Sequence, residues 1–245
     1  MKLKILGSSS SGNCYLLQNK TETLVLECGV KWNEVKKALN FNMTNICGCL
    51  ITHEHKDHCK YIKDVLKAGI DIYSTKGTLK ALKIDSHRSH VIEYLKPFKV
   101  GGYSILPFQT KHDCEEPVGF LIQHEDMGTL LFATDTYYLE YKFENLNHIL
   151  VECNYSLDIL NKNIEAGKIH PAFKNRVLQS HFEFDNVKNF LKANNLAQVA
   201  NIVLLHLSND NSDSARFKTE IEKLTGKLVH IADKGLEIDI GLYPF

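Results

Sequence analysis

The sequence predicts an α/β protein in which outer helices cover layered β-sheets. Short apolar and β-branched runs, typical of buried strands, recur along the 245 residues with turn residues between them. Helix-like segments follow the first strands and then alternate with further strands. This order of elements favours layered sheets with outer helices over a β-sandwich or a helix bundle.

The individual elements follow from these runs in chain order. The apolar runs predict strands over 3–6, 15–17, 24–26, 50–52, 119–122, 130–134, 149–151, 202–205, 228–231 and 236–240. The helix-like segments are 33–39, 61–68, 78–82, 156–166, 186–193 and 215–224. Asn33, Ser156 and Asp185 are plausible N-caps of three of these helices.

A single domain over residues 1–245 is the expected organisation, with a pair of small domains as the alternative. The five prolines are dispersed, and the chain has no Pro/Ser-rich linker, charge block or low-complexity tract. The run from Ser8 to Gly12 is too short to separate domains. We interpret it as a turn between two strands, with a backbone surface close to a ligand as the alternative.

The composition is that of a water-soluble globular protein, with 44% hydrophobic and 24% charged residues. Lys plus Arg and Asp plus Glu both number 29, so no global basic field holds nucleic acid and an anionic substrate needs a local site. The seven cysteines include no CxxC pair, which favours reduced thiols over a disulfide framework. Because no signal segment or membrane-length apolar run of roughly 18 residues occurs, we expect a cytoplasmic protein that does not enter a membrane.

The densest chemical pattern is His53-Glu54-His55-Lys56-Asp57-His58, directly after the buried run that ends at Thr52. Residues two apart in an extended or tightly turning segment project to one side, so His53 and His55 can share a metal. Asp57 and His58, on the following turn, can face a second metal. Imidazole and carboxylate ligands suit zinc, and also iron or manganese. A solvated, histidine-rich loop is the alternative interpretation.

This motif resembles the signature of the metallo-β-lactamase fold hydrolases, which are mostly dinuclear metal enzymes. The resemblance implies a four-layer αββα sandwich for this chain. It also implies three further ligands downstream, for which His112, Asp135 and His206 are the candidates, each expected at the end of a strand. By resemblance, one metal is bound by His53, His55 and His112, the other by Asp57, His58 and His206, and both by Asp135.

Further segments are similar to the WalJ/YycJ-type branch of this family, which is associated with DNA processing and exonuclease activity. They are 7–13, 26–29, 134–136, 151–155 and 205–211. The resemblance implies a phosphodiesterase or exonuclease acting on nucleic acid, DNA in preference to RNA, with two divalent ions, zinc first and manganese or iron as alternatives. A hydroxide bridging the metals would be the nucleophile, oriented by Asp57.

Two alternatives stay open. The same kind of metal centre hydrolyses small esters, thioesters, lactones and cyclic phosphodiesters in other members of the family. A noncatalytic protein with structural metals is the third interpretation, although structural zinc sites are normally closed by four protein ligands. No obligate protein partner is evident in the sequence.

Three more residues are candidates for the site. His181 could contact the scissile phosphate or protonate the leaving oxygen, and its alternative is a capping or packing role. Asn154 could bind substrate or support a ligand, and is otherwise a turn residue. Glu27 stands where the family usually has aspartate, and we expect it to hydrogen-bond a ligand histidine or the backbone of the metal loop.

Overall fold

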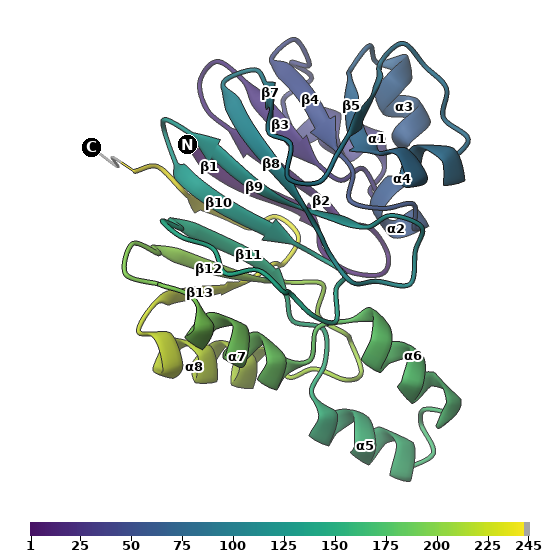
Figure 1. Cartoon of the computed structure of the whole chain (residues 1–245), viewed down its shortest axis with the longest axis vertical. Coiled ribbons are helices and arrows are strands. Elements are labelled where there is room, and N and C mark those ends of the chain that lie inside the picture. The colour runs from purple at the N-terminus through teal and green to yellow at the C-terminus, as the bar shows by residue number, and fades with distance from the viewer. Residues whose placement is uncertain (243–245) are drawn as a thin grey trace. The chain divides into compact units, whose positions relative to one another are not determined.

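The structure, a computed structural model, describes residues 1–242, which fall into two compact units (Figure 1). Unit 1 comprises Met1–Gln109, Cys114–Gly128 and the chain from Ala232 onward, and unit 2 comprises Thr110–Asp113 and Thr129–Ile231. The single domain over 1–245 stays a prediction, and its last three residues lie outside the described part.

Unit 1 is built on a seven-stranded mixed sheet. Its strand order is β14 (Glu237–Asp239), β1 (Lys2–Gly7), β2 (Cys14–Gln18), β3 (Thr23–Leu26), β4 (Ile46–Leu50), β5 (Ile72–Thr75) and β6 (Ser89–Ile92). The strands from β14 to β3 pair antiparallel, whereas those from β3 to β6 pair parallel. The carboxyl ends of β3 and β4 therefore lie at the same edge of this sheet.

Four short helices connect the strands of unit 1. They are α1 (Trp32–Ala38), α2 (Lys56–Cys59), α3 (Ile62–Lys67) and α4 (Lys76–Ala81). One apolar cluster joins alternate residues of the strands, such as Val25 and Cys49, to Val35 of α1 and Val65 of α3. This alternation places one face of the sheet under the helices. An antiparallel meander of β7 (Phe98–Val100), β8 (Tyr103–Gln109) and β9 (Val118–His124) completes unit 1.

Unit 2 is built on parallel strands. These are β10 (Gly128–Ala133), which begins at the unit boundary, β11 (His148–Glu152), β12 (Asn201–Leu205) and β13 (Leu228–Ile231). Every residue of β11 and β12 is buried, as is usual for parallel strands covered on both faces. The carboxyl ends of β10, β11 and β12 consequently meet at one edge.

The helices of unit 2 form two groups. The helices α7 (Phe184–Ala193) and α8 (Ser214–Thr225) pack together through Phe184 and Phe217, whose rings stack with centroids 4.1 Å apart. The helices α5 (Leu157–Glu165) and α6 (Ala172–Ser180) stand apart from that layer (Figure 1). Among residues 1–242, no helix has the length and apolar character needed to cross a membrane.

Several elements differ from those predicted. The strand predicted over 50–52 ends at Leu50, because residues 51–55 form the metal-motif loop, and α2 was not predicted inside the motif. Strands β5 to β7 were missed because they have only three or four residues each, and β8 was missed because Pro107 interrupts its apolar run. Helix α6 was also missed. Asn33 lies inside α1, and Glu183 rather than Asp185 caps α7, because its carboxylate accepts from the backbone N–H groups of residues 185 and 186.

Candidate metal centre

In unit 1 the HxHxDH motif folds into a compact group of side chains after β4. His53 and His55 lie in the loop, and α2 begins at Lys56, so Asp57 and His58 occupy its first turn. The ring centroid of His53 lies 4.7 Å from that of His55 and 4.2 Å from that of His58. His53 and His58 are buried, whereas His55 and Asp57 are partly exposed. Four potential metal donors thus converge from six consecutive residues.

Asn13, which precedes β2, supports the second half of the motif. Its side-chain amide donates to Asp57 Oδ2 over 3.3 Å and lies 3.0 Å from His58 Nε2. The backbone carbonyl of Asp57 also accepts from the Asn13 N–H over 2.7 Å. These contacts place the Asp57 carboxylate and the His58 imidazole side by side, 3.3 Å apart.

Glu27 lies beneath the motif, fully buried at the end of β3. Its carboxylate accepts from the Thr52 N–H over 3.3 Å and lies 3.6 Å from His58 Nδ1. Burial raises the pKa of Glu27, and the contacts with His58 and Thr52 partly oppose that rise. The structure therefore places Glu27 against both the loop backbone and a histidine of the motif.

In unit 2 the candidate residues follow three adjacent parallel strands. Asp135 comes after β10, Asn154 after β11 and His206 directly after β12. The register pairs Ala133 with Val151 and Glu152 with Leu205, which brings the three strand ends level. The topology of parallel strands thereby gathers residues that are 71 positions apart, from 135 to 206.

Asp135, Glu152, His181 and His206 form a potential metal-binding group in unit 2. Each offers a ligand atom, and these atoms all lie within 4.8 Å of one another. His206 Nδ1 is 3.6 Å from Asp135 Oδ1 and 3.4 Å from Glu152 Oε1. Imidazole nitrogens and carboxylate oxygens are suitable donors for zinc, manganese or iron, so the donor set fits a divalent ion.

His112 joins this group from the short segment 110–113. Its Nε2 lies 3.7 Å from Asp135 Oδ2, and its Nδ1–H donates to the Ser180 carbonyl over 2.7 Å. That hydrogen bond selects the tautomer with the lone pair on Nε2. Burial lowers the pKa of His112, which favours the neutral imidazole that a metal ligand must be.

Glu152 is the functional candidate that sequence reasoning missed. It is fully buried at the last position of β11, and its Oε1 accepts from His181 Nδ1–H over 2.6 Å. Its Oε2 accepts from the backbone N–H groups of Thr136 and Phe182. The signal in the sequence was an acidic residue directly after the apolar run 149–151, at a strand end.

Glu152 and His181 shift each other's pKa. Burial by itself would raise the pKa of Glu152, but the adjacent His181 holds it below its usual range. Burial would lower the pKa of His181, but Glu152 outweighs that effect and raises it. The protonated imidazole is therefore favoured in the metal-free protein, and the hydrogen bond to Glu152 fixes the ring through Nδ1.

Asn154 lies behind His206. Its side-chain amide donates to the His206 carbonyl over 2.7 Å and lies 3.2 Å from His206 Nδ1. Asn154 thus supports a candidate ligand, and it is only 8% exposed.

Three residues of the two groups have left-handed backbone conformations. The φ angles of Glu27, Asp135 and His206 are 65°, 44° and 52°. Non-glycine residues in this region typically cost about 1–3 kcal/mol each and are common at functional sites. These backbone conformations at the strand ends direct Glu27 toward His58 and bring Asp135 and His206 toward each other.

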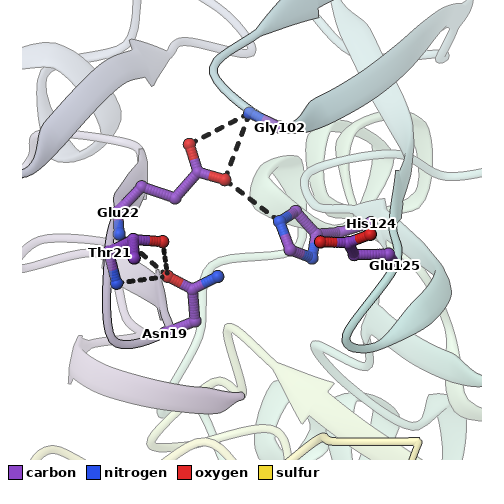
Figure 2. Close-up of a pocket in the computed structure, with 6 residues that line it drawn as sticks. All are labelled: Asn19, Thr21, Glu22, Gly102, His124 and Glu125. Atoms are coloured by element: carbon purple, nitrogen blue, oxygen red, sulfur yellow. Dashed lines mark hydrogen bonds and ion pairs between the residues drawn. The ribbon is translucent and has the colours of Figure 1, made fainter.

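A separate hollow of about 270 Å³ in unit 1 has a structural explanation (Figure 2). The Glu22 carboxylate in its wall accepts from the Gly102 N–H and from His124 Nε2, each over about 3.0 Å. Asn19 Oδ1 accepts from the backbone N–H groups of Thr21 and Glu22. These bonds tie the β2–β3 turn to the β7–β8 turn and to the end of β9, and we assign the hollow no catalytic role.

Comparison with known proteins shows that this chain is similar to the beta-lactamase superfamily. The family model of the beta-lactamase superfamily domain matches residues 24–207. The exodeoxyribonuclease WalJ of Streptococcus pneumoniae is 27% identical over 260 aligned residues, covering 99% of this chain and 93% of that protein. The exodeoxyribonuclease YycJ of Bacillus anthracis is 24% identical, covering 86% of this chain and 84% of that protein.

A solved structure supports the same fold. The metallo-β-lactamase fold protein YhfI of Bacillus subtilis superposes with a TM-score of 0.75 at 16% identity, covering 97% of this chain and 98% of that one. At this identity the likeness concerns the fold alone. It confirms the metallo-β-lactamase fold predicted from the sequence motif.

Proposed function

The chain belongs to the beta-lactamase superfamily and is a metal-dependent hydrolase, and from this premise we propose that it is an exodeoxyribonuclease with a dinuclear metal centre. Two exodeoxyribonucleases match most of its length, and both donor groups stand at strand ends. The substrate in this proposal is DNA, and the site of action is the cytoplasm.

In the proposed centre, the donor groups of the two units act together. His53, His55 and His112 would hold one ion, Asp57, His58 and His206 would hold the other, and Asp135 would serve both. Zinc is the first choice because imidazole nitrogens dominate the set, and manganese or iron are alternatives. When bound, such ions activate water and stabilise negative charge on a phosphodiester.

The protein's own residues then orient the reaction. Asp57, held by the Asn13 amide, accepts a hydrogen bond from the attacking water. His181, protonated and oriented by Glu152, donates its Nε2 proton to the leaving oxygen of the nucleotide. Asn154 supports His206 and contacts substrate. The 2.6 Å contact between His181 and Glu152 is the observation that carries this mechanism beyond metal binding.

A substrate panel tests the proposal. Metal-loaded protein is incubated with single- and double-stranded DNA, RNA and bis-p-nitrophenyl phosphate, with Asp57→Asn as the inactive control and Lys223→Ala as the matched surface control. We expect mononucleotide release from DNA ends by the wild type and by Lys223→Ala.

Two outcomes would replace the proposal. Turnover of small esters, thioesters or lactones without any cleavage of DNA would establish the small-molecule alternative. Full metal occupancy without turnover of any substrate would establish a noncatalytic metal-binding protein.

A further inference from the structure

A basic segment leads into the donor group of unit 2. The chain from Ala166 to Phe182 contains no Asp or Glu, yet it carries Lys168, Lys174 and Arg176. This concentration of positive charge stands out because the whole chain has a net charge of zero. It includes the whole of α6, whose last residue immediately precedes His181.

One face of α6 connects the exposed end of the helix to the site. Phe173, Arg176 and Ser180 are three and four residues apart, so they lie along the same face. At the site end of the helix, the backbone carbonyl of Ser180 accepts a hydrogen bond from His112. Phe173 lies about 10 Å away along the helix axis, at a rise of about 1.5 Å per residue. A ligand on this face would extend from the site by a few nucleotides.

Phe173 and Arg176 are both accessible. Phe173 is 57% exposed, although a large aromatic side chain gains free energy from burial. The Arg176 side chain is 68% exposed, and its Nε donates to Asp113 Oδ2 over 3.2 Å, beside His112. An ion pair this exposed contributes little to stability, so a phosphate can replace the Asp113 carboxylate at small cost.

We propose that the Phe173–Arg176 face of α6 binds the single DNA strand next to the scissile phosphate. Phe173 stacks on a base, and Arg176 contacts a backbone phosphate. Stacking and phosphate contacts are the two interactions by which proteins hold single strands without reading sequence, as an exonuclease must. The inference rests on the proposed function and names the surface that its substrate uses.

Four variants test this surface. Phe173→Leu keeps an apolar side chain but removes the aromatic ring, Phe173→Trp keeps a ring, and Arg176→Ala removes the charge. Lys223→Ala, which removes an exposed lysine from α8, is the matched control. Each is assayed on a single-stranded oligonucleotide and on bis-p-nitrophenyl phosphate, which is too short to reach Phe173.

We expect Phe173→Leu to raise the KM for the oligonucleotide by roughly five- to one-hundredfold, and Phe173→Trp to restore it. A plot of log affinity for the oligonucleotide against log salt concentration has a negative slope. Arg176→Ala should make this slope shallower by about 0.7, because one phosphate contact is lost. The ratio of oligonucleotide cleavage to diester cleavage should fall in Phe173→Leu and in Arg176→Ala. It should stay at the wild-type value in Lys223→Ala.

Two results would overturn the inference while leaving the proposed function intact. One is an unchanged KM and salt dependence in Phe173→Leu and Arg176→Ala. The other is an equal loss on both substrates, which would mean that α6 acts only through Asp113 and His112. A wild-type protein that cleaves the diester but no DNA would instead remove the proposed function, and this inference with it.

Discussion

Glu152 connects the orientation of His181 to the stability of unit 2. In the metal-free protein, the raised pKa of His181 stabilises the fold fully below the ordinary histidine value of 6.5, and this contribution is lost as the pH rises through the raised pKa. The lowered pKa of Glu152 stabilises the fold above the ordinary value of 4.5, and this contribution is lost as the pH falls through the lowered pKa. The pair therefore contributes fully between about pH 4.5 and 6.5.

We expect Glu152→Gln to lower the free energy of unfolding of metal-free protein most within that window. The difference from wild type should shrink above it, as His181 loses its proton, and below it, as Glu152 gains one. Chemical denaturation between pH 3 and 9 measures this, with Glu165→Gln on the surface of α5 as the control. A difference that does not vary with pH would contradict the ion pair.

His181→Ala tests the acid role directly. We expect a loss of about 10²–10⁴-fold in the rate of DNA cleavage, because a nucleotide oxygen leaves poorly without a proton. The loss on bis-p-nitrophenyl phosphate should be smaller, since nitrophenolate departs unaided. Metal content should stay at the wild-type level, because His181 is not among the seven proposed ligands. Equal losses on both substrates would eliminate proton donation and leave only substrate binding.

At the scale of elements, Gly29 allows the metal-motif loop to pack against the β3 end. A Cβ at Gly29 would overlap the carbonyl of Asp57 and approach the backbone nitrogen of Asn13. Backbone hydrogen bonds join Gly29 to Asn13 and Cys28 to His58 at the same place. The position therefore requires glycine because of close approach, not because of its φ angle.

Gly29→Ala should consequently displace Asp57 and weaken metal binding, although it removes no ligand. We expect at least a tenfold loss in affinity by competition with a chelator, the size typical of disturbed ligand support. Gly167→Ala, in the α5–α6 loop, is the control, because its φ of 70° strains an alanine far from the motif in sequence. Equal metal affinities in Gly29→Ala and wild type would contradict the packing argument.

The predicted elements show which signals the sequence carries. The buried ends of β10 and β12 stand out as apolar runs, so the family resemblance could be carried onto the residues that follow them, Asp135 and His206. The helix α2 was missed because four residues are too few to show helical periodicity, and α6 was missed because its sequence is only weakly amphipathic. Glu152 was missed because its hydrogen-bond partners, the backbone N–H groups of Thr136 and Phe182, are distant in the sequence. No motif around residue 152 indicates these contacts.

At the scale of the whole molecule, the proposed ligands come from both compact units. Metal binding should then stabilise the 53–58 loop of unit 1 and the ends of β10 and β12 in unit 2 together, because ligands that are ordered by one ion share its binding free energy. Amide hydrogen exchange with and without zinc measures this. Increased protection in one unit alone would contradict a shared centre.

The dinuclear exonuclease centre is tested most directly by measuring bound metal and DNA cleavage in the same samples. Metal-stripped protein is titrated with zinc or manganese, and the ions bound per chain are plotted against nucleotides released from end-labelled DNA. We predict that the exonuclease rate approaches its maximum only as two ions bind per chain, and that Asp135→Ala loses affinity for both. Full activity with one ion, or intact DNA with two ions bound, would contradict the dinuclear exodeoxyribonuclease.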